Sequence, residues 1–120
     1  MEVMDDAKVY ELQAEVYRVL SNPTRLMIID CIGDSEKTVS EIVECLGLSK
    51  SNVSQHLNLM RTVGLLCSRK EGRKVYYYLS DRRLLKAIAD IKKVLFERFV
   101  RCGRVISGEE LERLLEGMKP

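Results

Sequence analysis

Residues 38–79 read TVSEIVECLGLSKSNVSQHLNLMRTVGLLCSRKEGRKVYYYL, and this stretch decides the fold. Thr38 followed three residues later by Glu41 is a capping-box signature, which predicts the start of a helix. The helix is expected to run to Leu46, because the glycine that follows is the residue type that most often ends a helix.

A second helix is expected directly afterwards, with Ser49 as its cap and residues 50–63 as its body. The short turn between the two helices, which contains a glycine, is typical of a helix-turn-helix. Residues 65–70 and 74–79 are rich in β-forming side chains and predict a hairpin around residues 71–73. The order indicates a helix-turn-helix followed by a wing, a device that reads duplex DNA.

Helices are also expected on both sides of this stretch. Residues 5–20 carry an apolar face, and Asn22 and Pro23 are placed to cap and open a helix that ends at Ile32. Ser80 is expected to cap a long helix over residues 81–101, and Ser107 with Glu110 a short one over residues 107–116. The predicted fold class is mainly α with a small β-hairpin, in the order α-α-α-α-β-β-α-α.

Length and composition bound the class of protein. With 120 residues, of which 46% are hydrophobic, the chain can bury one core but hardly two, so residues 1–120 are expected to form a single domain. No apolar run approaches the roughly 18 residues of a membrane span, and the acidic start MEVMDD lacks the pattern of a signal peptide. We therefore expect a cytoplasmic protein whose cysteines are reduced.

Catalysis is not expected. The sequence has no Gly-rich phosphate loop, no histidine beside a candidate nucleophile and no metal constellation, so it predicts neither an enzyme nor a bound cofactor.

Charge is concentrated on the predicted DNA-binding part. The whole chain carries a formal net charge of +2, whereas residues 49–83 hold eight basic and two acidic side chains, a net +6 that leaves −4 for the rest. A basic segment that coincides with a helix-turn-helix and hairpin is the pattern expected for phosphate contact.

The helix over residues 50–63 predicts which side chains meet DNA. Val53, Leu57 and Met60 form its inward stripe, and no acidic residue lies between Ser49 and Val63. An ordinary packing helix would more commonly carry Glu-Lys pairs on its outer side. The predicted DNA contacts of this helix are Ser49, Lys50, Ser51, Asn52, Ser54, Gln55, Asn58 and Arg61.

The hairpin carries a cluster of cations at its tip. Its predicted phosphate contacts are Arg69, Lys70, Arg73 and Lys74. Each of them alone could instead protect a sheet edge from pairing, but four beside a recognition helix favour DNA contact.

The chain resembles the ArsR/SmtB family of winged-helix repressors. The resemblance covers about residues 16–100 and rests on SNPTRLMII (residues 21–29), LGLSKSNVSQHLNLMRTVGLL (residues 46–66) and RKEGRKVYYYLS (residues 69–80). It implies a homodimer that binds a palindromic double-stranded DNA operator and leaves it when an effector arrives.

The resemblance also implies a division of labour along the chain. Residues 16–79 would be the DNA-binding core with its wing, and residues 1–20 and 81–116 the dimerisation helices. The sequence agrees, because the last long helix carries an apolar stripe, formed by Leu84, Ile88, Ile91, Leu95, Phe99 and Cys102.

The family's metal motifs are not matched, so no metal site is expected. Thr38 and Ser40 stand where one motif has cysteines, and Arg83 and Val94 stand where the other has imidazoles, although Asp81 and Glu97 remain. The single histidine, His56, lies in the predicted recognition helix, where a packed or phosphate-contacting role is expected.

Cys31 and Cys102 are the candidate effector residues. Their placement, on the second helix and late in the long helix, is similar to that of the thiol-based, redox- or sulfide-responsive branch of the family. Each of them could instead be a small buried apolar residue, as is expected for Cys45 and Cys67. The sequence also fits a repressor that senses a soft metal or arsenical through thiolates, a DNA-binding regulator without a sensor, and a winged-helix protein-interaction module.

Overall fold

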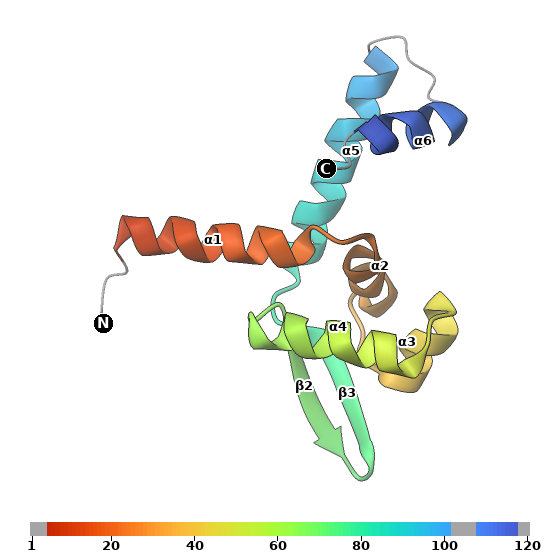
Figure 1. The fold of residues 1–120 in the computed structure, drawn as a ribbon. Helices are drawn as coiled ribbons and strands as arrows, with labels where there is room; N and C mark the ends of the chain where they lie inside the picture. The colour runs from red at the N-terminus through yellow and green to blue at the C-terminus, as the bar shows by residue number, and fades with distance from the viewer. Residues whose placement is uncertain (1–4, 102–107, 118–120) are drawn as a thin grey trace. The chain divides into compact units, whose positions relative to one another are not determined.

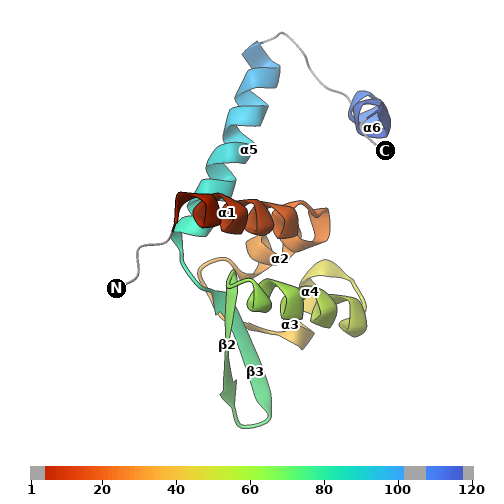
Figure 2. The ribbon, with the colours of Figure 1, turned by 60° about the vertical axis from the view of Figure 1, so that its left-hand side comes forward.

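The computed structural model describes residues 5–101 and 108–117. The elements are α1 (Asp6–Leu20), α2 (Pro23–Ile32), β1 (Lys37–Thr38), α3 (Val39–Leu46), α4 (Lys50–Thr62), β2 (Leu66–Glu71), β3 (Lys74–Leu79), α5 (Arg83–Arg101) and α6 (Gly108–Gly117). Figures 1 and 2 show them in two views. The chain forms two compact units, of which the first ends at Leu85 and the second begins at Lys86.

The first unit is a helix-turn-helix with a wing, as predicted. In Figure 1, α4 crosses the front of this unit and the β2–β3 hairpin projects below it. Between α3 and α4 lie only residues 47–49, and Gly47 ends α3 in the left-handed conformation, with φ 68°. This backbone conformation strains any residue that has a Cβ atom, which explains the glycine.

Three strands, one more than predicted, form an antiparallel sheet in the order β1-β3-β2. In the hairpin, Leu66 pairs with Leu79 and Glu71 with Lys74, whereas β1 pairs Lys37 with Tyr77. Sequence periodicity cannot show a strand of two residues, because alternation needs at least four positions.

The predicted helix caps are present at α2 and α3. The Asn22 side chain accepts a hydrogen bond from the Arg25 amide at 3.1 Å, with Pro23 in the first turn. Thr38 and Glu41 form a complete capping box, in which each side chain accepts from the other residue's backbone amide. Each cap satisfies amides that the helix leaves without a partner, and so fixes where the helix starts.

The core joins α2, α3, α4 and the base of the wing. The predicted stripe of α4, formed by Val53, Leu57 and Met60, is fully buried. It packs in a core that also contains Val19, Ile28, Ile29, Ile32, Ile42, Leu65, Leu66 and Leu79. Burying a side chain of this size stabilises a fold by roughly 1.5–3 kcal/mol, so this stripe fixes which face of α4 points outward.

The predicted cap of the long helix is wrong. The Ser80 hydroxyl donates to the carbonyl oxygens of Gly64 and Leu65, at 2.7 and 3.1 Å, and so holds the end of β3 against the start of β2. Asp81 takes the capping role, since its carboxylate accepts from the Arg83 amide at 2.9 Å. The other predicted cap, Ser107, lies outside the described residues.

In the second unit, α5 carries large apolar side chains on its surface. Ile91, Leu95 and Phe96 are 61%, 53% and 71% exposed. Exposed apolar side chains at this spacing mark a surface that a partner covers. No helix in the described part of the chain is long and apolar enough to cross a membrane.

Candidate nucleic-acid interface

The outer face of α4 is polar and open to solvent. All the side chains predicted to contact DNA from this helix are exposed: Ser49, Lys50, Ser51, Asn52, Ser54, Gln55, Asn58 and Arg61. Asn and Gln can form two hydrogen bonds to adenine in the major groove. The α4 face therefore presents the chemistry needed to read base edges.

Local contacts hold several of these side chains in place. The Ser49 hydroxyl accepts from the Asn52 amide at 3.1 Å, which leaves its own O–H to donate to a phosphate oxygen. Arg61 donates to the Asn58 side chain, also at 3.1 Å. This hydrogen bond restrains both side chains on the outer face of α4.

His56 anchors α4 to α2. Its Nδ1 accepts from Arg25 Nε at 3.2 Å, and a second nitrogen of Arg25 donates to the carbonyl of Val19 at 2.8 Å. Burial and, next, the Arg25 charge lower the pKa of His56. A neutral, half-buried imidazole in this place belongs to the packing of the helix-turn-helix.

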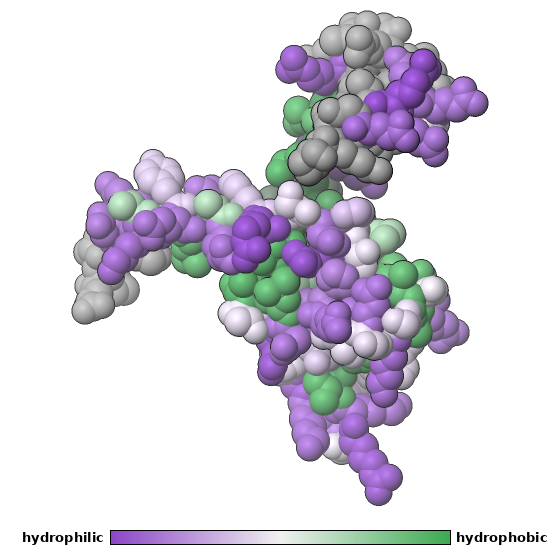
Figure 3. Space-filling view, in the orientation of Figure 1, coloured by the Kyte–Doolittle hydropathy of each residue, from purple (hydrophilic) through white to green (hydrophobic). Residues whose placement is uncertain are grey.

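The wing ends in free cations. Lys70, Arg73 and Lys74 are exposed, and none of them forms an ion pair with another residue that the structure describes. In Figure 3, hydrophilic side chains cover this end of the molecule, at the bottom of the view. These three side chains are therefore accessible to phosphates, although the charge of Lys74 also acts on the Glu41 carboxylate and helps to lower its pKa.

Arg69 is not free in the same way. It forms ion pairs with Glu36 at 2.6 Å and Glu71 at 2.9 Å, and its guanidinium lies 4.6 Å from the centre of the Tyr76 ring. The hydrogen bonds to these two carboxylates raise its pKa. Arg69 braces the wing against the segment before β1.

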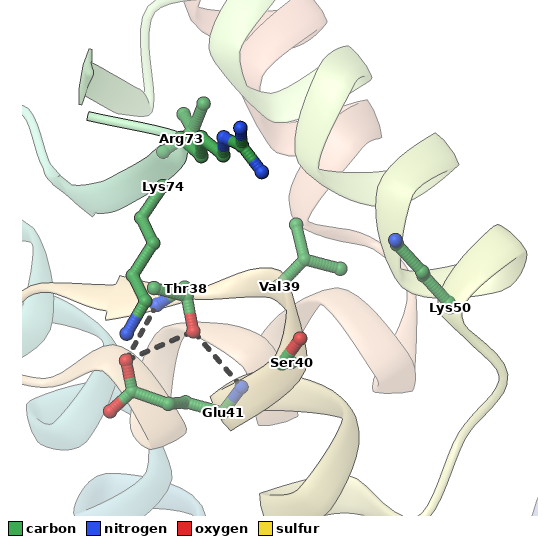
Figure 4. A pocket seen from close by; sticks show the side chains of 8 residues that line it. Thr38, Val39, Ser40, Glu41, Lys50, Arg73 and Lys74 are labelled. Atoms are coloured by element: carbon green, nitrogen blue, oxygen red, sulfur yellow. Dashed lines mark hydrogen bonds between the residues drawn. The ribbon is translucent and has the colours of Figure 1, made fainter. Parts of the chain in front are cut away.

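A hollow of about 530 Å³ separates the wing from the start of α3 and α4 (Figure 4). Lys50 of α4 and Arg73 of the wing reach toward each other across it. Thr38, Val39, Ser40, Glu41, Lys74 and Val75 complete the lining. Cations that face one another across an open hollow attract an anion, and the exposed Ser40 hydroxyl adds a donor.

One carboxylate also lines the hollow, but the capping box engages it. Glu41 accepts from the Thr38 amide and hydroxyl, each at 3.0 Å. These two hydrogen bonds are the main cause of its lowered pKa. Glu41 is thus a fixed negative charge with one oxygen, Oε1, engaged twice, and three cations line the same hollow.

The acidic residues left from the family's zinc motif are engaged by basic neighbours. Asp81 pairs with Arg83 at 2.8 Å, and these hydrogen bonds lower the pKa of Asp81 to about 2. Glu97 lies 4.0 Å from Lys93. Among residues 5–101 and 108–117, no group of three His, Cys, Asp or Glu side chains is placed to hold a metal ion.

The structure describes three of the four cysteines. Cys31 and Cys67 are half-buried and Cys45 is exposed, all as free thiols. Cys102 lies outside the described residues, so the predicted pair of Cys31 and Cys102 stays a prediction. Burial, followed by the neighbouring Cys45 thiol, raises the pKa of Cys31 to about 11.

Two features of the site escaped prediction from sequence. The start of α3, at Thr38 and Ser40, lines the hollow, and the Cys45 thiol neighbours Cys31. The sequence did carry a hint that Cys31 and Cys45 are neighbours, because each lies near the end of one of two consecutive short helices. Nothing in the sequence sets the distance from the wing to α3.

Known proteins share this architecture. Residues 22–68 match the family described as "Bacterial regulatory protein, arsR family". The HTH-type transcriptional regulator CmtR of Mycobacterium tuberculosis is 34% identical over 103 residues, which is 82% of this chain and 87% of that protein. The segment that matches the family contains the whole of α2, α3 and α4.

Solved structures agree over a longer stretch. The homodimeric winged helix-turn-helix DNA-binding domain of Mb0332 from Mycobacterium bovis has a TM-score of 0.72 and 27% identity, covering 82% of this chain and 94% of that one. Reduced HlyU from Vibrio cholerae has a TM-score of 0.65 and 31% identity, covering 71% and 93%. The chain therefore belongs to the arsR family of bacterial regulatory proteins.

Proposed function

We propose that this protein is a homodimeric transcriptional repressor that binds a double-stranded DNA operator in a sequence-specific way. The observation that carries the proposal is the exposed polar face of α4, which lies beside a cation-lined hollow and a wing with three free cations. This surface combines base-reading amides with phosphate-binding charges.

The geometry supports distinct roles within the interface. Asn52 and Gln55, one turn apart on α4, would read base edges, while Ser49 and Lys50 at the helix start would hold a phosphate. Lys70, Arg73 and Lys74 would grip the backbone beside the groove. Arg69 would shape the wing rather than grip the DNA backbone, since its charge is already matched by Glu36 and Glu71.

Two observations support the proposed homodimer: the apolar surface of α5 and the homodimeric state of a relative. The Mb0332 domain is described as homodimeric, and Ile91, Leu95 and Phe96 of this chain are exposed as an interface would require before assembly. Residues 1–20 and 81–116 are the proposed dimerisation helices. Two recognition helices related by a two-fold axis would read half-sites about 34–36 Å apart, and hence a palindrome.

Selection from a pool of random duplexes tests the proposal. The selected duplex, labelled, is then titrated with Asn52→Ala and Gln55→Ala. Loss of two hydrogen bonds to one base is expected to weaken binding about 5- to 100-fold and to relax selection at one base pair. Asp30→Asn, an exposed position on α2, is the matched control and should bind as the wild type does.

The same titration separates DNA recognition from a protein-interaction module. Affinity for the selected duplex should fall steeply as salt rises, because bound cations release counterions from DNA. If the pool yields no preferred sequence, and binding is weak and insensitive to salt, the operator proposal is wrong.

We further propose that thiol chemistry at Cys31 and Cys102 releases the operator. The structure of HlyU, a relative 31% identical, is described as that of the reduced protein, which supports sensitivity to oxidation. The raised pKa of Cys31 disfavours its thiolate, so Cys102 would be the attacking sulfur. The linked state would favour a dimer whose recognition helices no longer fit adjacent grooves.

Operator titration before and after peroxide treatment tests the switch. The wild type should lose affinity on oxidation, whereas Cys102→Ser should keep it. Equal loss in both proteins, or no loss in either, would contradict this pairing. A soft-metal sensor would instead give a thiolate absorption band when metal is added.

A further inference from the structure

Two thiols meet where α2 packs against α3. Cys31 lies one residue before the end of α2, and Cys45 one residue before the end of α3. The two helices pack against each other, and Cys45 is the neighbouring thiol that adds to the raised pKa of Cys31. Each sulfur is therefore the other's neighbour within a single chain.

The surroundings of the two sulfur atoms differ. Cys45 is exposed, whereas Cys31 is half-buried. A soluble oxidant therefore reaches Cys45 more readily than Cys31. This asymmetry separates the thiol that is attacked from the thiol that resolves the product.

The donor set fits a covalent link better than a metal ion. A structural zinc site takes four ligands. Around Cys31 and Cys45, within the residues that the structure describes, no third His, Cys, Asp or Glu completes such a group. Two sulfur atoms, by contrast, are all that a disulfide requires.

We propose that Cys31 and Cys45 form an oxidisable dithiol, which a hydroperoxide converts into a disulfide within one chain. This pair is distinct from the pair of Cys31 with Cys102 and uses the contact between α2 and α3.

The chemistry proceeds in two balanced steps. The Cys45 sulfur attacks the peroxide O–O bond, an S–O bond forms and the O–O bond breaks, which leaves a sulfenic acid on Cys45. The leaving oxygen takes up the Cys45 proton and departs as an alcohol, or as water when the oxidant is hydrogen peroxide. The Cys31 sulfur then displaces the sulfenic oxygen, so that an S–S bond forms, the S–O bond breaks and the Cys31 proton leaves in water. Two thiols are oxidised to one disulfide, and one hydroperoxide is reduced.

Ionisation of Cys31 controls the second step. Burial and the Cys45 thiol keep the pKa of Cys31 at about 11, Lys37 opposes this with its positive charge, and Glu41 adds to it. The resolving step should accelerate as pH rises toward this pKa, because the thiolate is the nucleophile.

The bond also bears on the proposed switch. Cys31 can join only one other sulfur, so a bond to Cys45 withdraws it from Cys102. This regulatory consequence rests on the proposed thiol switch, whereas formation of the bond itself does not.

Peptide mapping tests the bond directly, because trypsin separates all four cysteines. Cys31 falls in residues 26–37, Cys45 in residues 38–50, Cys67 in residues 62–69 and Cys102 in residues 102–104. Cys102→Ser protein is treated with hydrogen peroxide, alkylated and digested without reduction. We expect residues 26–37 linked to residues 38–50, from a species that migrates as a monomer on a non-reducing gel.

Two further variants make the result decisive. Cys67→Ser is the matched control and should give the same linked peptides, whereas Cys31→Ser should leave a sulfenic acid on Cys45 that dimedone traps. Alkylated Cys31 and Cys45 after peroxide treatment, or a link between two copies of residues 38–50, would overturn the proposal. Operator affinity is not part of this readout, so failure here leaves the proposed DNA-binding function untouched.

Discussion

At the scale of single residues, the wing divides its cations between two tasks. Arg69 satisfies Glu36 and Glu71 and stacks on Tyr76, whereas Lys70 has no such partners among the described residues. A guanidinium suits the first task because its planar fork bonds several acceptors at once. A lysine suits the second task, the proposed contact with a phosphate, because it is a point charge on a flexible stem.

This division predicts different salt dependences. Lys70→Ala should lower the slope of log affinity against log salt by about 0.9, the amount that one phosphate contact contributes. Arg69→Ala should leave the slope unchanged and weaken binding only through a looser wing. Anisotropy titrations of a labelled operator duplex at a series of salt concentrations measure both. An equal loss of slope in the two variants would show that Arg69 also touches phosphate.

A second residue-scale prediction concerns pH. The pKa of His56 is lowered in the folded protein, so the unfolded chain binds a proton more readily. This contribution to stability is complete above the unfolded pKa of about 6.5 and is lost as pH falls through the folded value. Urea unfolding at about pH 7.5 and about pH 5, on either side of this pKa, measures the effect. Between these two pH values the free energy of unfolding should fall less for His56→Gln than for the wild type. An equal fall in both proteins would show that His56 is not the cause.

At the scale of elements, most boundaries followed from caps and periodicity. Asn22, Thr38 and Gly47 act within a few residues of their own positions, so the sequence shows them directly. Ser80 was misjudged because its partners, Gly64 and Leu65, lie at the other strand of the wing. The brace on Arg69 and the pairing of Cys31 with Cys45 likewise join positions that only the fold brings together.

The turn between α3 and α4 gives a test at this scale. Gly47→Ala should lower the free energy of unfolding by roughly 1–2 kcal/mol, because φ 68° places a Cβ atom against the following carbonyl. Gly108→Ala, a helical glycine with open space around its Cα atom, is the control and should cost nothing. Chemical denaturation measures both. A neutral Gly47→Ala would mean that the turn relaxes into another conformation.

Oxidation should also change the stability of these elements. A disulfide between Cys31 and Cys45 closes a loop of about 15 residues, which the chain-entropy model values at about 3 kcal/mol. Thermal unfolding of peroxide-treated Cys102→Ser should therefore begin at a higher temperature than that of the reduced protein. Cys45→Ser should show no such gain. A lower unfolding temperature after oxidation would indicate that the bond distorts the packing of α2 on α3.

At the scale of the whole molecule, the proposed function depends on assembly. The α4 face of one chain would read one half-site only, so the proposed palindrome needs two chains, which the proposed dimerisation helices α1 and α5 would hold together. The sequence predicted the apolar stripe of α5, because helical periodicity shows an apolar face whichever surface covers it. It could not reveal the geometry of the pair, which depends on contacts between chains.

Charge on the exposed α5 face should break the assembly. Ile91→Glu with Leu95→Glu is expected to shift the protein to monomer and to weaken operator binding at least about tenfold, because a buried carboxylate without a partner is costly. Lys92→Glu, an exposed position on the same helix, is the control. Sedimentation velocity reports the oligomeric state. A double variant that stays dimeric would place the interface elsewhere.

The shortest strand has a mechanical consequence. Thr38 ends β1, where it pairs with Tyr76 of the wing, and its side chain also opens α3. The sheet that carries the proposed phosphate contacts is therefore joined without an intervening loop to α3, the first helix of the helix-turn-helix. A duplex whose bending displaces its phosphates should disturb the proposed phosphate and base contacts together, so this protein should discriminate among operators by their stiffness as well as by their base sequence.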